Sequence, residues 1–283
     1  MNPLGLVQTA RATRRLLATA PVPDGWSRAA VKTQLRLASG RVGHADGLVQ
    51  VPVGAFDVAG FSVSSLAYLH REIFVELQYW FSARGPDPLI VDGGSNIGMS
   101  VLFFKALYPG ARVIAFEPAR SAHELLQRNV EANHLDGVEV HHAALGRTNG
   151  DVQLYEDPAD PATFRMSTRP GRIEGAPNTV PGRRLSDFVY GEVDLVKLDV
   201  EGAEDDVLGD LVDSGAIARV GQLIVEYHHQ LDPTRDFLGA FLERLREQGF
   251  SYHVSARERI AKRAALEPDQ DVLVHAFRVP VSL

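Results

Sequence analysis

The sequence has no cysteine among its 283 residues, and none of its apolar runs is long. The absence of cysteine excludes disulfide bonds, thiolate catalysis and zinc sites built on cysteine. A transmembrane helix needs about 18 or more apolar residues in a row, so we expect no membrane span. Basic residues are outnumbered as well. Lys and Arg total 29 against 36 Asp and Glu, a formal net charge of −7, which disfavours a nucleic acid partner.

The composition is that of a globular protein, with 45% hydrophobic and 23% charged residues. Near the start, Arg14 and Arg15 precede an apolar stretch that is too short for the core of an export signal. We therefore interpret the first 20 residues as a short amphipathic helix in a cytoplasmic protein.

Two regions are expected along the chain. Residues 1–85 form an accessory region, with two short strands within 47–63 and a helix over 66–80 that shows helical spacing of its apolar residues. Residues 86–283 form the main domain. Its length suits one sizeable core.

From residue 89 onward, strands and helices alternate. A buried strand at 89–91 is followed by a helix at 97–107, and the pattern then repeats. Such alternation predicts an α/β fold with a mostly parallel sheet covered by helices on both faces. The last two strands, 251–255 and 272–278, have no strong helix between them and are expected to pair as an antiparallel hairpin.

A glycine-rich loop follows the first strand of this domain and reads VDGGSNIG over residues 91–98. Gly93, Gly94 and Gly98 allow a tight turn and a close approach of the backbone to a ligand. A purely structural turn between strand and helix is the alternative for this loop taken alone.

An acidic residue, Glu117, ends the next strand about 20 residues beyond the loop, where a carboxylate can accept both hydroxyls of a ribose. A solvated strand end is the alternative. Asp92 stands in front of the first glycine. Its charge would repel a pyrophosphate but suits the cationic end of S-adenosylmethionine (SAM), so a nicotinamide-dependent oxidoreductase is the less favoured hypothesis.

Three segments, 90–98, 115–118 and 196–204, resemble those of class I SAM-dependent methyltransferases of the FkbM family. The resemblance implies a Rossmann-like fold with a seven-stranded sheet and a reversed final hairpin. It also implies O-methylation of a hydroxyl on a sugar, glycan or secondary metabolite. N-methylation of a small molecule and a non-catalytic SAM-binding role stay open. The turn after the fourth strand lacks the prolines typical of enzymes that methylate bases.

The resemblance also implies a cofactor site. Glu117 would hold the ribose, and Ala143 and Ala144 would lie near the adenine. The full expected set is Asp92, Gly93, Gly94, Asn96, Gly98, Glu117, Ala143, Ala144 and Asp199. The loop departs mildly from the family pattern, because Gly94 and Ser95 stand where Val or Ala is common.

The candidate catalytic residues are Asp199 and Glu201, after the fourth strand, and His228, at the end of the fifth. An imidazole titrates near neutrality, so His228 is the candidate base for the acceptor hydroxyl. A surface histidine or a strand cap is its alternative. Asp199, Glu226 and His228 can alternatively hold a divalent cation, although we predict no metal.

Other charged groups receive structural interpretations. The acidic run Glu204, Asp205 and Asp206 is typical of a helix N-terminus. His141 and His142 are expected to end a strand near the adenine. The segment 156–182 is expected to be an irregular loop. The arginines in and beside it would be solvated or would close over an anionic acceptor; they are Arg165, Arg169, Arg172, Arg183 and Arg184. The expected partner is a small-molecule or saccharide acceptor, and a homo-oligomer stays open.

Overall fold

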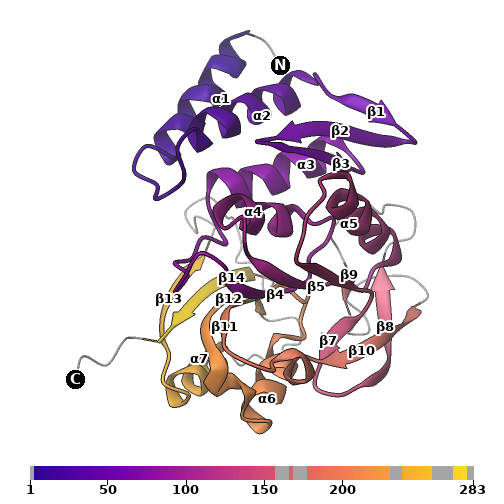
Figure 1. Cartoon of the computed structure of the whole chain (residues 1–283), viewed down its shortest axis with the longest axis vertical. Helices are drawn as coiled ribbons and strands as arrows, with labels where there is room; N and C mark the ends of the chain where they lie inside the picture. Colours follow the sequence, from indigo (N-terminus) through magenta and orange to yellow (C-terminus); the bar gives the residue numbers. More distant parts are fainter. Residues whose placement is uncertain (1–2, 157–165, 168–176, 230–237, 257–269, 279–283) are drawn as a thin grey trace, which may run out of the picture.

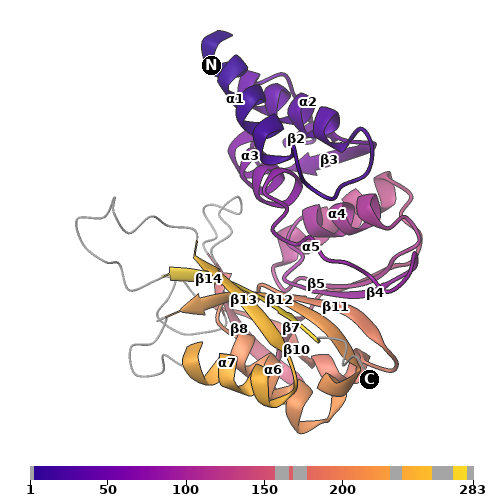
Figure 2. The same cartoon turned by 90° about the vertical axis from the view of Figure 1, so that its left-hand side faces the viewer.

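The structure, a computed structural model, describes residues 3–156, 166–167, 177–229, 238–256 and 270–278. A seven-stranded sheet forms the centre of the molecule, with helices on both faces and the N-terminal elements stacked beyond one helical layer (Figures 1 and 2). Among the described residues, no helix combines the length and apolar character needed to cross a membrane.

The central sheet has the order β13-β14-β12-β11-β4-β5-β6. Its strands are β4 (Leu89–Gly93), β5 (Arg112–Phe116), β6 (Val138–His141), β11 (Val193–Leu198), β12 (Val220–His229), β13 (Ser251–Ala256) and β14 (Gln270–Phe277). The pairings from β6 to β12 are parallel, whereas β14 is antiparallel to both of its neighbours. The predicted Rossmann-like sheet with a C-terminal antiparallel hairpin is therefore confirmed.

Successive residues of the central strands point into two different cores, because side chains alternate across a sheet. Ile90 packs with the core that includes α4, whereas Val91 packs with the core that includes α6 and α7. The helices concerned are α4 (Met99–Leu107), α5 (Arg120–Ala132), α6 (Glu204–Asp213) and α7 (Leu238–Glu247). Burial on both faces explains why these strands read as short continuous apolar runs.

The N-terminal region packs against the helical layer on the α4 and α5 side. It consists of α1 (Pro3–Leu16), α2 (Trp26–Ser39), β1 (Gly43–Ala45), β2 (Leu48–Val53), β3 (Phe56–Gly60), α3 (Val63–His70) and the π-helical turn η1 (Arg71–Val75). Asn129 of α5 and Asn133, the residue that caps its C-terminal end, bind the outer strand β3. Asn129 bonds both the N–H and the C=O of Ala59, and Asn133 does the same for Asp57.

The helix expected over 66–80 is wrong in its second half. The α-helix ends at His70, and the π turn then closes with a bond from the N–H of Glu76 to the carbonyl of Arg71. Leu77 follows with a φ of +56°, a conformation that bulky residues rarely adopt. Apolar spacing cannot reveal this change, because the wider turn still buries Ile73 among its neighbours.

A second, four-stranded sheet has the order β7-β10-β8-β9. Its strands are β7 (Ala144–Gly146), β8 (Gly150–Glu156), β9 (Met166–Ser167) and β10 (Asn178–Arg184). The 156–182 segment was expected to be irregular, and this is wrong for β10, which pairs with both β7 and β8. Pro181 and Gly182 mask the strand in the sequence, since both residues are rare in strand interiors. The short helix η2 (Leu185–Phe188) precedes β11, and the short helix η3 (Ala216–Arg219) precedes β12.

Candidate active site

The glycine loop, residues 92–98, lies at the carboxyl end of β4 and packs tightly against its neighbours. The N–H groups of Gly94 and Ser95 both donate to the carbonyl of Phe116, at 3.0 and 2.9 Å. Gly94 has a φ of +78°, and a Cβ atom there would lie 1.8 Å from the carbonyl oxygen of Asp199. Only glycine fits this position, so the loop joins the ends of β4, β5 and β11 into one surface.

Asp92 has its partners inside the protein. Its side chain is fully buried, accepts a hydrogen bond from Ser100 Oγ at 2.5 Å and lies 3.3 Å from Lys197 Nζ. Lys197 also donates to the carbonyl of Gly94 at 2.6 Å and to that of Gly93 at 3.2 Å. Burial alone would lower the pKa of Lys197, but the nearby carboxylates of Asp92 and Asp199 raise it.

Lys197 is a site residue for which the sequence analysis gave no role. A lysine inside the apolar strand β11 was the available signal, because a buried cation needs a buried anion. The buried pair of Lys197 and Asp92 ties the loop to β11. The Asp92 carboxylate is thus already compensated by a cation of the protein itself.

Glu117 lies directly after β5 and is 1% exposed. One carboxylate oxygen accepts from the N–H of Asn96 and the other from the N–H of Ala119, both at 2.8 Å. Burial raises the pKa of Glu117 from 4.5 to about 7, against the lowering effect of these two bonds. Each oxygen has a second lone pair, so the carboxylate can still accept a ligand hydroxyl.

The end of β6 lies beside Glu117. The carbonyl of His141 accepts from the N–H groups of Glu117 and Ala143, each at 3.1 Å. Ala143 and Ala144 are buried. The His141 ring stacks on Phe116 with centroids 4.8 Å apart, and His142 bonds the carbonyl of Pro118 at 2.9 Å, so these two histidines have partners within the protein.

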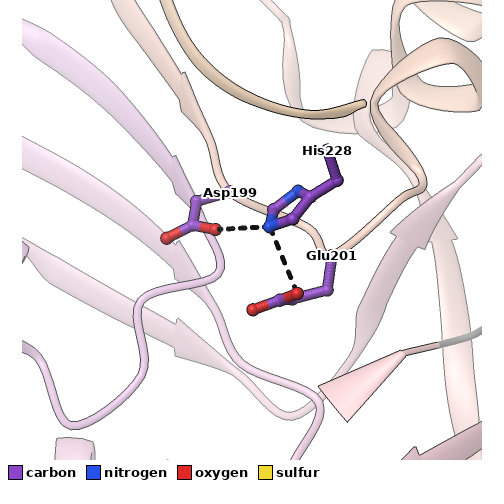
Figure 3. Close-up of side chains that lie close together, drawn as sticks. All are labelled: Asp199, Glu201 and His228. Atoms are coloured by element: carbon purple, nitrogen blue, oxygen red, sulfur yellow. Dashed lines mark ion pairs between the residues drawn. The ribbon is translucent and has the colours of Figure 1, made fainter. Parts of the chain in front are cut away.

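A second group of side chains, the histidine cluster, consists of Asp199, Glu201, Glu204 and His228. Figure 3 shows three of them: the imidazole of His228 points toward the carboxylates of Asp199 and Glu201. The Nε2 atom of His228 lies 3.2 Å from Glu201 Oε2 and 3.9 Å from Asp199 Oδ1. Asp199 follows β11 and His228 ends β12, so the parallel pairing of these strands brings the two together.

The other ring nitrogen of His228 faces away from that pair. Its Nδ1 atom lies 2.8 Å from Glu204 Oε1, a carboxylate that is 1% exposed. Burial would lower the pKa of His228, but the surrounding carboxylates, Glu204 foremost and then Glu201, raise it well above 6.5. These carboxylates therefore favour the protonated form of the imidazole relative to the unperturbed side chain from which the prediction started.

Two residues of the N-terminal region reach this edge of the sheet. Gln78 Nε2 donates to Glu226 Oε2 at 2.7 Å, and the hydroxyl of Tyr79 lies 3.4 Å from Asp199 Oδ2. Neither residue was predicted from the sequence, because both precede the glycine loop. Within the described part of the chain, the metal-capable group with ligand atoms within 4.8 Å of one another is Asp199, Glu201 and His228, with Glu201 in place of the expected Glu226.

The arginines divide between described and undescribed parts of the chain. Arg165, Arg169 and Arg172 lie outside the described residues. Arg183 follows Gly182 in β10. Arg184 Nε binds Asp210 Oδ1 of α6 at 2.8 Å. That contact links the second sheet to α6.

Comparison with known proteins places these features in a family. Residues 92–252 match the model of the methyltransferase FkbM domain. The chain is 35% identical over 168 residues to Methyltransferase 1 of Beauveria bassiana, covering 52% of this chain and 67% of that one. It is 31% identical to Methyltransferase sdnD of Sordaria araneosa over 173 residues, or 50% and 67% of the two chains. It is 27% identical to the 31-O-demethyl-FK506 methyltransferase FkbM of Streptomyces tacrolimicus over 239 residues, or 72% and 88%.

Proposed function

The chain belongs to the FkbM methyltransferase family, and from that premise we propose that it transfers the methyl group of SAM to a hydroxyl of a small-molecule or saccharide acceptor. The chain is a SAM-dependent methyltransferase. The hydroxyl acceptor is supported by relatives whose names specify O-methylation, the FkbM protein named above and the 2-O-methyltransferase NoeI of Sinorhizobium fredii.

The residues at the glycine loop fit the cofactor. SAM supplies a methyl group that its sulfonium already activates. Glu117 keeps one lone pair on each carboxylate oxygen for a ribose hydroxyl, after accepting one backbone N–H on each. The remaining proposed contacts are backbone and small side chains that allow close approach: Gly93, Gly94, Asn96, Gly98, Ala143 and Ala144.

Asp92 and Asp199 have different proposed roles toward the cofactor. Asp92 is neutralised by Lys197, so its contribution is to hold the loop in shape. Asp199 is 25% exposed at its side chain and is the proposed carboxylate toward the cationic end of SAM. The sequence suggested that Asp92, at the end of β4, faces the cationic end of SAM. We propose that Asp199, at the end of the neighbouring strand β11, has this role instead.

The observation that carries the hydroxyl proposal is the direction of His228 Nε2, toward Asp199 and Glu201 at the carboxyl ends of β11 and β12. A neutral imidazole there accepts the hydroxyl proton at Nε2 while the acceptor oxygen forms its bond to the methyl carbon. The electron pair of the broken carbon–sulfur bond returns to sulfur. The proton then leaves His228 for solvent, and the two carboxylates stabilise the imidazolium meanwhile.

Calorimetric titration with SAM tests the cofactor site. Asp92→Ala and Glu117→Ala should both weaken SAM binding strongly, the first by loosening the loop and the second by removing the ribose acceptor. Asp187→Ala, a change at an exposed residue of η2, is the control and should bind SAM as the wild type does. Unchanged SAM affinity in both site variants would disprove the proposed cofactor site.

The acceptor class is tested with isotopically methyl-labelled SAM. Saccharides and polyketide alcohols should become labelled on oxygen. The same compounds with the hydroxyls replaced by hydrogen should not. Label found on nitrogen of amine compounds alone would replace the hydroxyl proposal by N-methylation.

A divalent cation is the alternative use of the same side chains. The specific observation is that ligand atoms of Asp199, Glu201 and His228 lie within 4.8 Å of one another, a set of hard oxygen donors with one imidazole. We propose the proton-accepting role because Nε2 of His228 already faces the carboxylates of Asp199 and Glu201. Titration with Mn²⁺ followed by electron paramagnetic resonance distinguishes the two.

A further inference from the structure

Glu204 occupies an unusual place for the first residue of a helix. It begins α6, where acidic residues are common because they favour the N-terminal end of the helix dipole. Such residues are normally solvated. Glu204 is instead 1% exposed, and its Oε1 atom accepts both the N–H of Gly202 at 3.0 Å and a bond from His228 Nδ1 at 2.8 Å.

The neighbouring acids of the same turn provide a comparison. Asp206 is exposed, and Asp205 accepts from the hydroxyl of Tyr227 at 2.8 Å. A helix N-terminus alone therefore does not bury an acid here. Burial would raise the pKa of Glu204, yet His228 and the N–H of Gly202 lower it, so the buried carboxylate is ionised.

The contact also fixes how the imidazole is turned. An ionised carboxylate only accepts hydrogen bonds, so both nitrogens of the protonated imidazole donate: Nδ1 to Glu204 at 2.8 Å and Nε2 toward Glu201 at 3.2 Å. The Nδ1 contact is the shorter one, and the Glu204 side chain is 2% exposed against 19% for Glu201. The neutral ring therefore keeps its proton on Nδ1 and carries the lone pair on Nε2. The third facing carboxylate, Asp271, is 56% exposed and 3.9 Å from Nε2, too distant for a hydrogen bond.

We propose that Glu204 is a positioning residue, which holds His228 in the one tautomer and ring orientation that present a bare Nε2 to the acceptor hydroxyl. This inference rests on the proposed function, since it assigns to Nε2 the proton taken from the acceptor. Glu204 itself receives no proton. Its charge stays opposite the imidazolium that forms, the same logic by which a buried carboxylate orients a histidine beside a nucleophile.

The test compares three variants of the full chain. Glu204→Ala removes the acceptor of the Nδ1 proton. Glu204→Gln keeps an oxygen of the same reach and loses only the charge. Asp206→Asn loses an equal charge from the same helical turn at an exposed site and is the matched control. The Gln variant also guards against a failure of the Ala variant to fold.

The readout is the tautomer of His228, followed by nitrogen-15 correlation spectra of histidine-labelled protein at a pH where the imidazole is neutral. His228→Gln identifies its signals. We expect Nδ1–H in the wild type, Glu204→Gln and Asp206→Asn, and loss of that preference in Glu204→Ala. Turnover, measured as S-adenosylhomocysteine release, should fall about 100-fold in the Ala variant and recover most of that loss in the Gln variant.

Two results would overturn the proposal: an Nε2–H tautomer in the wild type, or a Glu204→Ala protein that keeps both the wild-type tautomer and the wild-type turnover. SAM affinity separates this failure from that of the proposed function. All three variants should bind SAM within about twofold of the wild type, since the carboxylate of Glu204 bonds His228 and the N–H of Gly202, and Gly202 is not a proposed SAM contact. A wild-type protein that does not bind SAM contradicts the function and leaves the tautomer result standing.

Discussion

The glycine loop and the histidine cluster lie at the same edge of the central sheet, and they treat buried charge in opposite ways. At the loop, the buried cation Lys197 lies 3.3 Å from the buried Asp92, with side chains 2% and 0% exposed, and 3.7 Å from the more exposed Asp199. At the histidine cluster, a single imidazole faces the carboxylates of Asp199, Glu201 and Glu204. The buried charges of Asp92 and Lys197 match one another, whereas the carboxylates of the cluster outnumber its imidazole, and two of them, Asp199 and Glu201, are partly exposed.

This difference indicates that the glycine loop has a structural role and that the histidine cluster is the reactive group. The buried charges of Asp92 and Lys197 are satisfied by one another, so neither needs a proton or a ligand, and the pair holds the backbone in one conformation. A cationic imidazole among several carboxylates can lose its proton and take it up again, and its neighbours hold either state.

The largest effect is expected from breaking the matched pair at the loop. Lys197→Met leaves Asp92 buried without a cation, and the free energy of unfolding should fall by about 3–5 kcal/mol in urea denaturation. The double variant Asp92→Asn, Lys197→Met removes both charges and should recover most of the loss. A loss of less than about 1 kcal/mol of unfolding free energy in Lys197→Met would show that Asp92 does not depend on Lys197 for its charge compensation.

The next effect concerns Glu117, a buried acid on the loop side whose carboxylate oxygens accept backbone N–H groups at 2.8 Å. Its folded pKa of about 7 exceeds 4.5, so the folded state keeps a proton that the unfolded state has lost, and stability falls as pH rises from 4.5 to 7. Glu117→Gln lacks this penalty. Its stability relative to the wild type should rise by up to about 3 kcal/mol between about pH 4 and pH 8.

Urea denaturation at each pH measures that rise. The exposed residue Glu124 provides the control, because Glu124→Gln should show a difference of no more than about 0.5 kcal/mol across the same range. If the difference in unfolding free energy between Glu117→Gln and the wild type stayed constant with pH, the raised pKa of Glu117 would be disproved.

At the histidine cluster the effect should fall on chemistry and spare binding. His228→Ala removes the proposed proton acceptor, so turnover should fall about 100-fold while the dissociation constant for SAM stays within about twofold. Since the pKa of His228 is raised, wild-type transfer should increase with pH through that value. His253→Ala, at an exposed position of β13, is the control. Normal turnover in His228→Ala would remove it as the base.

The smallest effect is expected from chelation. If the cluster works through a proton on its imidazole, EDTA should change turnover by less than about twofold. If EDTA abolished turnover and added Mn²⁺ restored it, the cluster would act by binding a divalent cation and not by accepting a proton.

Local spacing made much of this edge predictable from the sequence. The glycine loop, Glu117, Asp199 and His228 each lie directly at the end of a strand, so recognising the strand also located the residue. Lys197 carried a signal too, as the one cation inside an apolar strand, but its partner lies 105 positions earlier and only the pairing of β4 with β11 brings them together.

The remaining parts depend on contacts that spacing does not encode. Gln78 reaches Glu226 across 148 positions because a π turn and a left-handed Leu77 redirect the chain. Glu204 reads as an ordinary helix start, and only the direction of the neighbouring imidazole shows its second role. The strand β10 is hidden by Pro181 and Gly182, whose own preferences oppose the pairing that β7 and β8 impose.

Asn129 of α5 and its C-cap Asn133 have a consequence for contacts between copies of this protein. Four residues along a helix advance about 6 Å, and two residues along a strand advance nearly the same distance. Asn129 and Asn133 therefore match Ala59 and Asp57 step for step, and their amides serve the outer edge of β3 as another strand would. An exposed edge invites pairing with a foreign chain. At this edge the two asparagine side chains already occupy the backbone groups of Ala59 and Asp57, which are therefore not open to pairing with another chain.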